Sequence, residues 1–217
     1  MTAQPLSREV PVKPAETALL FIDVQNYCAS RNGGEFKDVR PEVFEEKLGY
    51  YFRSLEDIAV PNMRRLQLAC RQAKIEVMYT MIQSLTKDGR DRSLDYKITG
   101  FNVPPGSWDA EMLEAIKPGD DEIVIPKTSS SVFISTNIDY ILRNLGVRYL
   151  VIAGIVTDQC ISSAVRDACD LGYLVTCVTD ACTTYTKQRH DYALAEIKGY
   201  CRQRTTDEFL KELKEIG

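Results

Sequence analysis

The chain of 217 residues contains a single histidine, His190, and its seven cysteines include no C-x-x-C pair. Structural zinc sites need clusters of cysteine and histidine at short spacings, so we expect no metal ion. The cysteine count is odd, and a chain of this length can bury a core without disulfide bonds. We therefore expect reduced thiols and a cytoplasmic protein.

Long hydrophobic runs, basic clusters and nucleotide-binding glycine motifs are also missing. The longest apolar stretches, such as YLVIAGIV at 149–156, have the length of a strand, and the polar N-terminal segment does not resemble a signal peptide. The formal net charge is −4, so we expect neither nucleic acid nor a membrane as a partner. Because no G-x-G-x-x-G follows the first apolar run and no P-loop occurs, we expect no cofactor.

What the chain does contain is a regular alternation of short apolar runs with longer amphipathic ones. This alternation is typical of βαβ units and a parallel sheet. It predicts one domain over residues 1–217, a three-layer α/β/α Rossmann-like sandwich with a mainly parallel six-stranded sheet. The predicted strands lie at 17–23, 75–82, 122–126, 148–154 and 173–180, with a short sixth near 200–205.

Capping signals place several helix ends. The stretch 135–146 has capping residues at its front and ends at Gly146, which favours a left-handed stop. The last helix opens with a capping box of Thr205 and Glu208. A further helix is expected to begin around Pro61, where a missing N–H has no cost.

Two segments, 26–55 and 83–107, interrupt the alternation. Both are long and polar, and the second is punctuated by glycine and proline. Structureless connections of this length in a compact domain usually form lids or binding loops, so we expect both to shape a pocket.

Three reactive side chains follow predicted strands. Asp23 ends the first strand, Lys127 ends the third, and Cys160 comes just after the fourth. In an open parallel α/β sheet, ligands bind outside the carboxyl ends of the strands, so these residues are expected to meet at one edge. Taken singly, each has an ordinary alternative: a turn aspartate, a solvated lysine and a buried cysteine.

Cys160 is expected near the N-terminus of a helix. If Thr157 is the cap, Cys160 is the third helical residue, where unpaired N–H groups and the helix dipole favour an anion. A lysine nearby would lower the pKa of the thiol further. The sequence therefore predicts a reactive thiolate, with a buried, inert thiol as the alternative.

The segments around these residues resemble the isochorismatase-like cysteine hydrolase family. The similar stretches are LLFIDVQN, VIPKTSSSVFISTNIDYILRNLGVRYLVIAG and GIVTDQCISSAVRDACDLGYLVTCVTDACTT, and the resemblance covers residues 15–210. It implies that Asp23, Lys127 and Cys160 are catalytic. It also implies a cis peptide bond between Ile155 and Val156, with the backbone N–H groups of Val156 and Cys160 as the oxyanion hole. Relatives form dimers and tetramers, so a homo-oligomer is expected.

Within this family, two branches fit the sequence poorly. Nicotinamidases bind a metal through an aspartate and histidines downstream of the first strand, and this chain has no such histidines. True isochorismatases lack the nucleophilic cysteine. The segment VPPGSWDAEML at 103–113 is similar to ureidoacrylate and biuret amidohydrolases. The resemblance therefore implies a cysteine-dependent amidohydrolase that cleaves a C–N bond of a small amide, ureide or carbamoyl compound through a thioester.

Other interpretations stay open at this point. The chain could be a non-catalytic or redox-active interaction protein on the same fold, or a family hydrolase with a different small substrate. Tyr27 and Cys28 stand where the family often has an acidic residue and phenylalanine. The resemblance therefore does not define the floor of the pocket or the substrate. The expected substrate-binding residues follow the first strand or lie on the two long segments, where aromatics can equally serve packing. They are Gln25, Tyr27, Arg31, Tyr96 and Phe101.

Overall fold

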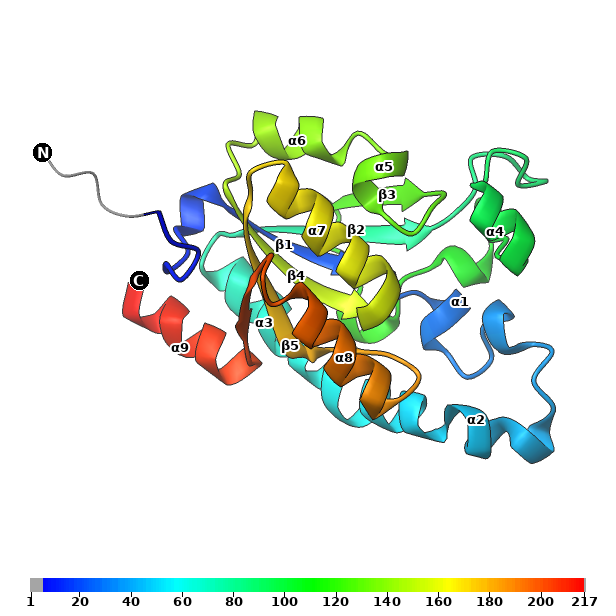
Figure 1. Cartoon of the computed structure of the whole chain (residues 1–217). Coiled ribbons are helices and arrows are strands. Elements are labelled where there is room, and N and C mark those ends of the chain that lie inside the picture. Colours follow the sequence, from blue (N-terminus) through cyan, green and yellow to red (C-terminus); the bar gives the residue numbers. More distant parts are fainter. Residues whose placement is uncertain (1–5, 217) are drawn as a thin grey trace, which may run out of the picture.

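The computed structural model describes residues 6–216 and contains a six-stranded sheet (Figure 1). Neighbouring strands are all parallel, in the order β3-β2-β1-β4-β5-β6. This confirms the predicted fold class and all six predicted strand positions to within a few residues. The strands are β1 (Thr17–Ile22), β2 (Glu76–Ile82), β3 (Ile123–Lys127), β4 (Tyr149–Ile155), β5 (Leu174–Thr183) and β6 (Arg202–Arg204).

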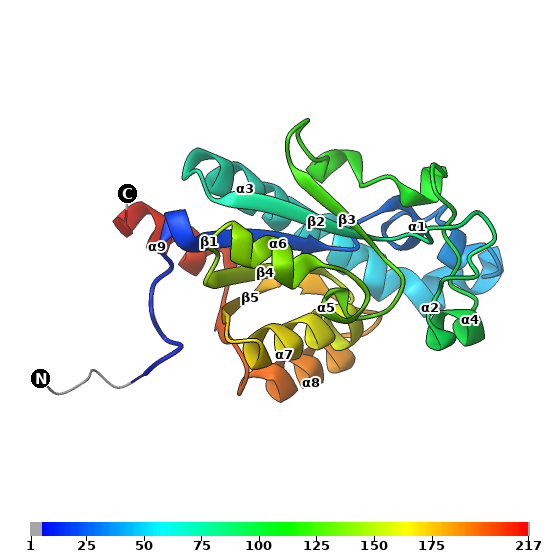
Figure 2. The same cartoon turned by 90° about the horizontal axis from the view of Figure 1, so that it is seen from above.

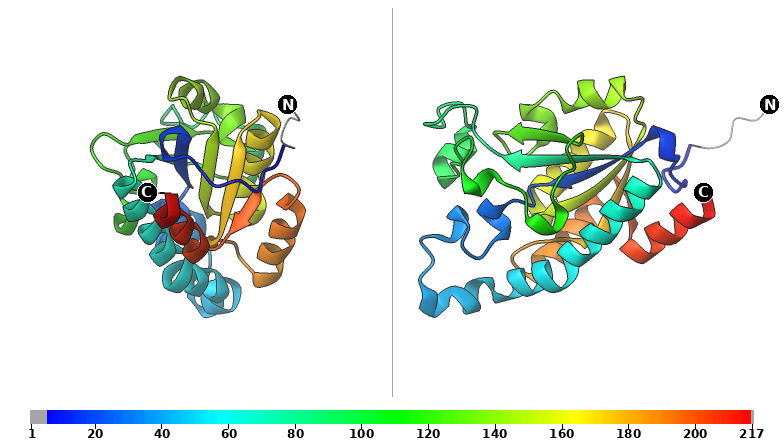
Figure 3. Two further views of the ribbon diagram at one scale, coloured as in Figure 1. Left: turned by 90° about the vertical axis from the view of Figure 1, so that its left-hand side faces the viewer. Right: turned by 180° about the vertical axis from the view of Figure 1, so that it is seen from behind.

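Helices cover both faces of the sheet, which makes three layers (Figures 2 and 3). One face carries α2 (Pro41–Ser54), α3 (Val60–Gln72) and α9 (Thr206–Ile216). The other carries α5 (Val132–Ser135), α6 (Ile138–Asn144), α7 (Ser162–Asp170) and α8 (Lys187–Ile197). Two short helices, α1 (Asn26–Ala29) and α4 (Leu94–Thr99), lie beyond the carboxyl ends of the strands (Figure 1).

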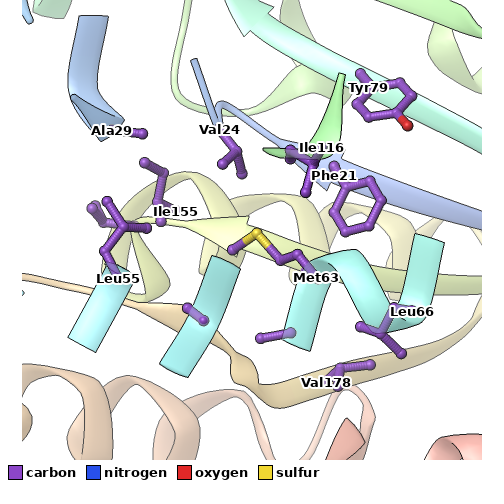
Figure 4. Close-up of a cluster of buried hydrophobic side chains, with 14 of the residues drawn as sticks. Phe21, Val24, Ala29, Leu55, Met63, Leu66, Tyr79, Ile116, Ile155 and Val178 are labelled. Carbon is purple, nitrogen blue, oxygen red and sulfur yellow. The ribbon is translucent and has the colours of Figure 1, made fainter. Parts of the chain in front are cut away.

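The central strand β1 is buried along its whole length because it packs on both layers. Successive side chains of a strand point to opposite faces. Leu19 and Phe21 accordingly belong to the cluster under α2 and α3, where Phe21 lies near Met63 of α3 (Figure 4). Leu20 and Ile22 belong to the cluster under α6 and α7.

Two predicted helix ends are confirmed. Gly146 follows α6 with φ +72°, a left-handed conformation. At α9, the N–H of Thr205 donates to Glu208 Oε2 at 2.7 Å, and the N–H of Glu208 donates to Thr205 Oγ1 at 3.3 Å. These reciprocal bonds are those of a capping box.

The expected helix start at Pro61 and the expected loop over 26–55 are both partly wrong. Residues 41–54 form α2, which continues through a π-helical turn, η3 (Leu55–Ala59), directly into α3. Pro61 lies in the first turn of α3, just after the widened turn, where its missing N–H interrupts the helix least. Segment 83–107 is irregular apart from α4.

Short 3-10 turns complete the chain. They are η1 (Pro14–Glu16), η2 (Gly34–Phe36), η4 (Trp108–Ala110) and η5 (Glu114–Ile116). None of the helices in residues 6–216 is both long enough and apolar enough to cross a bilayer.

Candidate active site

Asp23 directly follows β1, and its backbone is left-handed, with φ +59°. Its N–H donates to the carbonyl of Thr80 on β2 at 3.0 Å, and Thr80 Oγ1 donates to its carboxylate oxygen Oδ1 at 2.9 Å. The second oxygen, Oδ2, lies 2.8 Å from Lys127 Nζ. Among the described residues, however, no donor offers Oδ2 a hydrogen bond of good geometry. Asp23 therefore presents a fixed carboxylate with one oxygen able to accept a proton.

Lys127, the last residue of β3, is fully buried and central to the site. Besides Asp23, its Nζ contacts Cys160 Sγ at 3.4 Å, Tyr96 Oη at 3.0 Å and the carbonyl of Ser129 at 2.9 Å. Burial, the largest single influence, would lower the pKa of the ammonium, but Asp23, Cys160 and Tyr96 together outweigh burial. The pKa of Lys127 consequently lies well above its ordinary value, and the side chain stays charged.

Cys160 lies in the π-helical turn η6 (Thr157–Ile161) that opens α7, and its exposed fraction is 6%. Burial raises the pKa of its thiol to about 12. Lys127 acts against this rise, while the charge of Asp23 adds to the rise. The expected thiolate with a lowered pKa is therefore wrong: the resting sulfur is protonated, because desolvation outweighs the nearby lysine.

The predicted cap of this helix also needs correction. Val156 occupies the cap position, and Thr157 is the first residue of η6, so Cys160 is its fourth residue. The hydroxyl of Thr157 is paired with His190 Nδ1 of α8 at 2.8 Å instead. His190 thus supports the turn from outside, and it is absent from the cavity walls described below.

Two hollows border the Cys160 thiol. The smaller one is walled by Asp23, Cys160 and Val156 among others. The larger one shares Phe101, Gln159 and Cys160 with the first. The peptide bond between Ile155 and Val156 is cis, and both of these residues line the smaller hollow. The thiol is therefore reached from cavities despite its burial.

The five expected substrate-binding residues have different locations. Phe101 lines both hollows, and Tyr96 lines the larger one while it contacts Lys127. Gln25 and Tyr27 line neither hollow, and Arg31 lies at a separate surface hollow, where it pairs with Glu56.

Each of these three side chains has partners of its own within the protein. The side-chain amide of Gln25 is fully used in bracing the loop: it donates to the carbonyls of Ile82 and Asp109 at 2.9 Å and accepts from the N–H of Ile82 at 2.6 Å. The ring of Tyr27 packs edge-on against Phe101, with centroids 5.6 Å apart, and so supports the cavity wall from behind.

Sequence reasoning missed five residues of the smaller hollow. They are Cys28, Glu35, Ile82, Gln159 and Tyr185. Gln159 immediately precedes Cys160, so its place next to the thiol was a signal in the sequence. Glu35 and Tyr185 are 150 positions apart, and no local pattern relates them.

In residues 6–216 no group of three or more histidine, cysteine, aspartate or glutamate side chains is placed to hold a metal ion. The site brings together a carboxylate, an ammonium and a thiol at the carboxyl ends of β1, β3 and β4. The strand order reverses between β1 and β4, which is where such sheets bind ligands.

The isochorismatase domain family matches residues 17–208. The chain belongs to the isochorismatase family. Among curated relatives, it is 27% identical over 188 residues to the ureidoacrylate amidohydrolase RutB of Rhizobium rhizogenes strain K84, covering 79% of this chain and 72% of that protein. It is 26% identical over 197 residues to RutB of Agrobacterium fabrum strain C58, covering 83% and 82%.

Solved structures of other proteins share the fold. A cysteine hydrolase from Pseudomonas syringae pv. phaseolicola 1448A superposes with a TM-score of 0.77 over 100% of both chains, at 21% sequence identity. N-carbamoylsarcosine amidase from Thermoplasma acidophilum gives a TM-score of 0.65 over 89% of this chain and 98% of that one, at 24% identity.

Proposed function

We propose that this protein is a cysteine-dependent amidohydrolase that cleaves the C–N bond of a small amide, ureide or carbamoyl compound. The observation that carries the proposal is the contact of Lys127 Nζ with both Cys160 Sγ and Asp23 Oδ2, at 3.4 and 2.8 Å, on the wall of a cavity. Its membership of the isochorismatase family and its similarity to amidohydrolases support the same activity.

The proposed reaction begins with proton transfer from Cys160 to Asp23. Because the pKa of the buried thiol is about 12, the sulfur needs a base at the moment of attack, and Asp23 Oδ2 has the free lone pair. The sulfur then forms a bond to the carbonyl carbon, and the carbonyl electrons move to its oxygen. Lys127 stays protonated and stabilises the negative charges on either side of it.

The tetrahedral oxyanion would be held by the backbone N–H groups of Val156 and Cys160. The supporting observation is that both residues line the smaller hollow next to Asp23. One donor of this kind is typically worth about 3 kcal/mol of transition-state stabilisation.

Collapse of this intermediate breaks the C–N bond. Asp23 returns its proton to the departing nitrogen, and ammonia or an amine leaves while Cys160 retains the acyl group as a thioester. Water then attacks the thioester with Asp23 again as the base, which releases the carboxyl product and restores the thiol.

The two long segments supply the cavity walls, which supports their proposed role as lids. Tyr96 and Phe101 come from segment 83–107, and Cys28 and Glu35 come from segment 26–55. Excluding water in this way strengthens the electrostatic contacts around the reacting atoms. We place the enzyme in the cytoplasm, since its seven cysteines are all free thiols. We also propose that it assembles as a homo-oligomer, which light scattering would measure directly.

A panel of small amides tests the proposal. Ammonia release is measured with biuret, ureidoacrylate, N-carbamoyl compounds, nicotinamide and oxamate, for the wild type and for Asp23→Asn. We expect at least one linear ureide or amide to be hydrolysed, and the variant to lose about 100-fold or more in kcat because it lacks the base. Ammonia release that is unaffected by Asp23→Asn would contradict the proposed mechanism.

A further inference from the structure

Glu35 lines the smaller hollow together with Asp23 and Cys160, and no step of the proposed reaction uses it. It lies in the 3-10 turn η2. Tyr185, which follows β5, donates a hydrogen bond from its hydroxyl to Glu35 Oε1. Among residues 6–216, no side chain or backbone group donates to Glu35 Oε2, so this oxygen is available to a ligand.

The backbone on both sides of Glu35 is firmly held. The N–H of Gly34 donates to Asp109 Oδ1 at 3.1 Å. Phe36 is buried among aromatic rings, with its centroid 5.2 Å from that of Phe52 and 6.0 Å from that of Tyr51. Glu35 is therefore a preorganised group of the cavity wall, because its two neighbours are anchored elsewhere.

The cavity has no cation to offer an anionic substrate. The described lining of the smaller hollow contains the carboxylates of Asp23 and Glu35 and no lysine or arginine. Lys127, next to the thiol, is already balanced by Asp23 at 2.8 Å. In the larger hollow the described lining adds Asp95 and Asp158 and again no lysine or arginine.

Arginine does lie behind this wall, but it is occupied. Arg189 pairs with Asp158 Oδ2, and its guanidinium stacks 5.0 Å above the ring of Tyr185. The walls around Cys160 therefore carry excess negative charge, and in the smaller hollow this charge belongs to Glu35.

The state of Glu35 responds to pH near neutrality. Burial raises the pKa of its carboxyl to about 7; the hydrogen bond from Tyr185 acts against this rise, and the charge of Asp23 adds to it. The other titratable groups near it, the thiol of Cys28 and the hydroxyls of Tyr51 and Tyr185, all have pKa values raised well above their ordinary values. Those three groups stay neutral, so Glu35 is the side chain here whose charge changes.

We propose that Glu35 is a specificity-determining residue that binds the end of the substrate remote from the scissile carbonyl. The substrate is a small amide whose remote end donates N–H hydrogen bonds and carries no negative charge, such as a second carbamoyl or amide group. This inference rests on the proposed function and narrows it: ureides that end in a carboxylate are disfavoured, because an ionised Glu35 repels them and an N–H donor satisfies its free oxygen.

Two thiol reagents of nearly equal size test this charge selection at Cys160. Iodoacetamide ends in a neutral amide, and iodoacetate ends in a carboxylate. The rate of alkylation of Cys160 by each is measured by peptide mass spectrometry. Cys169, a partly exposed thiol on α7, provides the reference ratio in the same molecule. The ratio of the two alkylation rates at one thiol does not depend on the pKa of that thiol, because both reagents react with the same thiolate.

In the wild type, we expect the ratio of the iodoacetamide rate to the iodoacetate rate to be about tenfold larger at Cys160 than at Cys169. A tenfold ratio corresponds to the contribution of about one hydrogen bond to a charged group. The excess should grow from about pH 6 to about pH 8.5, as Glu35 loses its proton. In Glu35→Gln, which keeps the shape and removes the charge, the two thiols should show the same ratio at both pH values. Glu46→Gln, an exposed residue of α2, changes the net charge equally and should behave like the wild type.

Tyr185→Phe provides a second variant with the carboxylate retained. It should keep the preference for iodoacetamide, and its pH dependence should shift to higher pH because the stabilising hydrogen bond is lost. Equal ratios at Cys160 and Cys169 in the wild type would overturn the inference. An excess that Glu35→Gln does not change would also overturn it, and thermal unfolding of each variant confirms that the comparison is made on folded protein.

Failure of this inference and failure of the proposed function give different results. The alkylation ratio needs no turnover, so it holds or fails whatever the amide panel shows. If amides are hydrolysed and carboxylate-ended ureides react as well as neutral ones, the function stands and the role of Glu35 is wrong.

Discussion

At the scale of single residues, the site is organised by Lys127, a buried cation with a carboxylate on one side and a thiol on the other. Burying an ammonium costs several kcal/mol, and the contact with Asp23 recovers that cost only while both partners are present. The ion pair thus holds the Asp23 side chain in a fixed position next to Lys127, which itself contacts the sulfur.

Lys127→Met should reveal this dependence. It leaves Asp23 buried without its partner, so we expect the free energy of unfolding in urea to fall by about 3–5 kcal/mol. Adding Asp23→Asn to Lys127→Met removes the orphaned charge and should recover part of the lost stability, with no recovery of amide hydrolysis. Equal stability of Lys127→Met and the wild type would contradict the account of this pair.

Glu35 should make the stability of the fold depend on pH. Its folded-state pKa, about 7, lies above the ordinary value of 4.5, so the stability associated with its protonated form is complete below 4.5 and is lost as the pH rises through 7. In thermal unfolding, the stability of Glu35→Gln should therefore rise relative to that of the wild type between about pH 4.5 and pH 7. Above pH 7 the difference in stability should stay constant. A difference that does not vary with pH would show that Glu35 titrates normally.

The positions of Asp23, Lys127 and Cys160 were predictable because strand ends of a parallel sheet share an edge, and apolar runs mark those ends in the sequence. The ionisation of Cys160 was not. Its pKa depends on how completely the fold removes water from the sulfur, and this outweighs the helix position and the lysine that the sequence shows. Glu35 was missed for a similar reason, since its partner Tyr185 lies 150 residues away.

At the scale of elements, the approach of β4 to β1 controls where Cys160 lies relative to Asp23. Gly154 of β4 pairs with Ile22 of β1, one residue before Asp23. A Cβ at position 154 would lie 2.6 Å from the backbone nitrogen of Ile22, and φ of Gly154 is +130°, which L-residues rarely adopt. The two strands therefore meet closely because this residue has no side chain.

Gly154→Ala should separate the two strands or prevent folding. We expect a loss of about 4 kcal/mol or more in the free energy of unfolding, together with loss of hydrolysis, because a backbone clash beside Asp23 has no flexible group to absorb it. Gly146→Ala is the matched control: its φ is +72°, but a Cβ there meets nothing within 4 Å. Its cost should be only about 1–2 kcal/mol, measured by urea denaturation, with activity retained.

Strands and capped helices were predictable at this scale, since alternation and capping residues are local signals. The continuity of α2 and α3 was not, because Pro61 is a typical helix-start residue. The helix passes through this region by a π-helical turn in which Leu55 and Ala59 are buried against the rest of the protein. Tertiary packing, which the local sequence does not show, decides that the chain stays helical.

At the scale of the whole molecule, the sheet order β3-β2-β1-β4-β5-β6 places the reactive groups on both sides of its reversal point. Asp23 and Lys127 come from the half that contains β1, β2 and β3, and Cys160 comes from the half that contains β4. Segments 26–55 and 83–107 then cover this edge and contribute Glu35 and Phe101 to its cavity. The two halves and both segments must be in place together for the thiol to meet a base, a cation and a substrate.

Whether Cys160 is the nucleophile is decided by measuring ammonia release with Cys160→Ala. The assay uses the best amide of the panel and compares this variant with Cys169→Ala, which removes a thiol from α7 outside the cavity. We expect Cys160→Ala to retain the thermal stability of a folded protein and to show no ammonia release above the uncatalysed rate, while Cys169→Ala turns over like the wild type. Substantial ammonia release by folded Cys160→Ala would contradict the account.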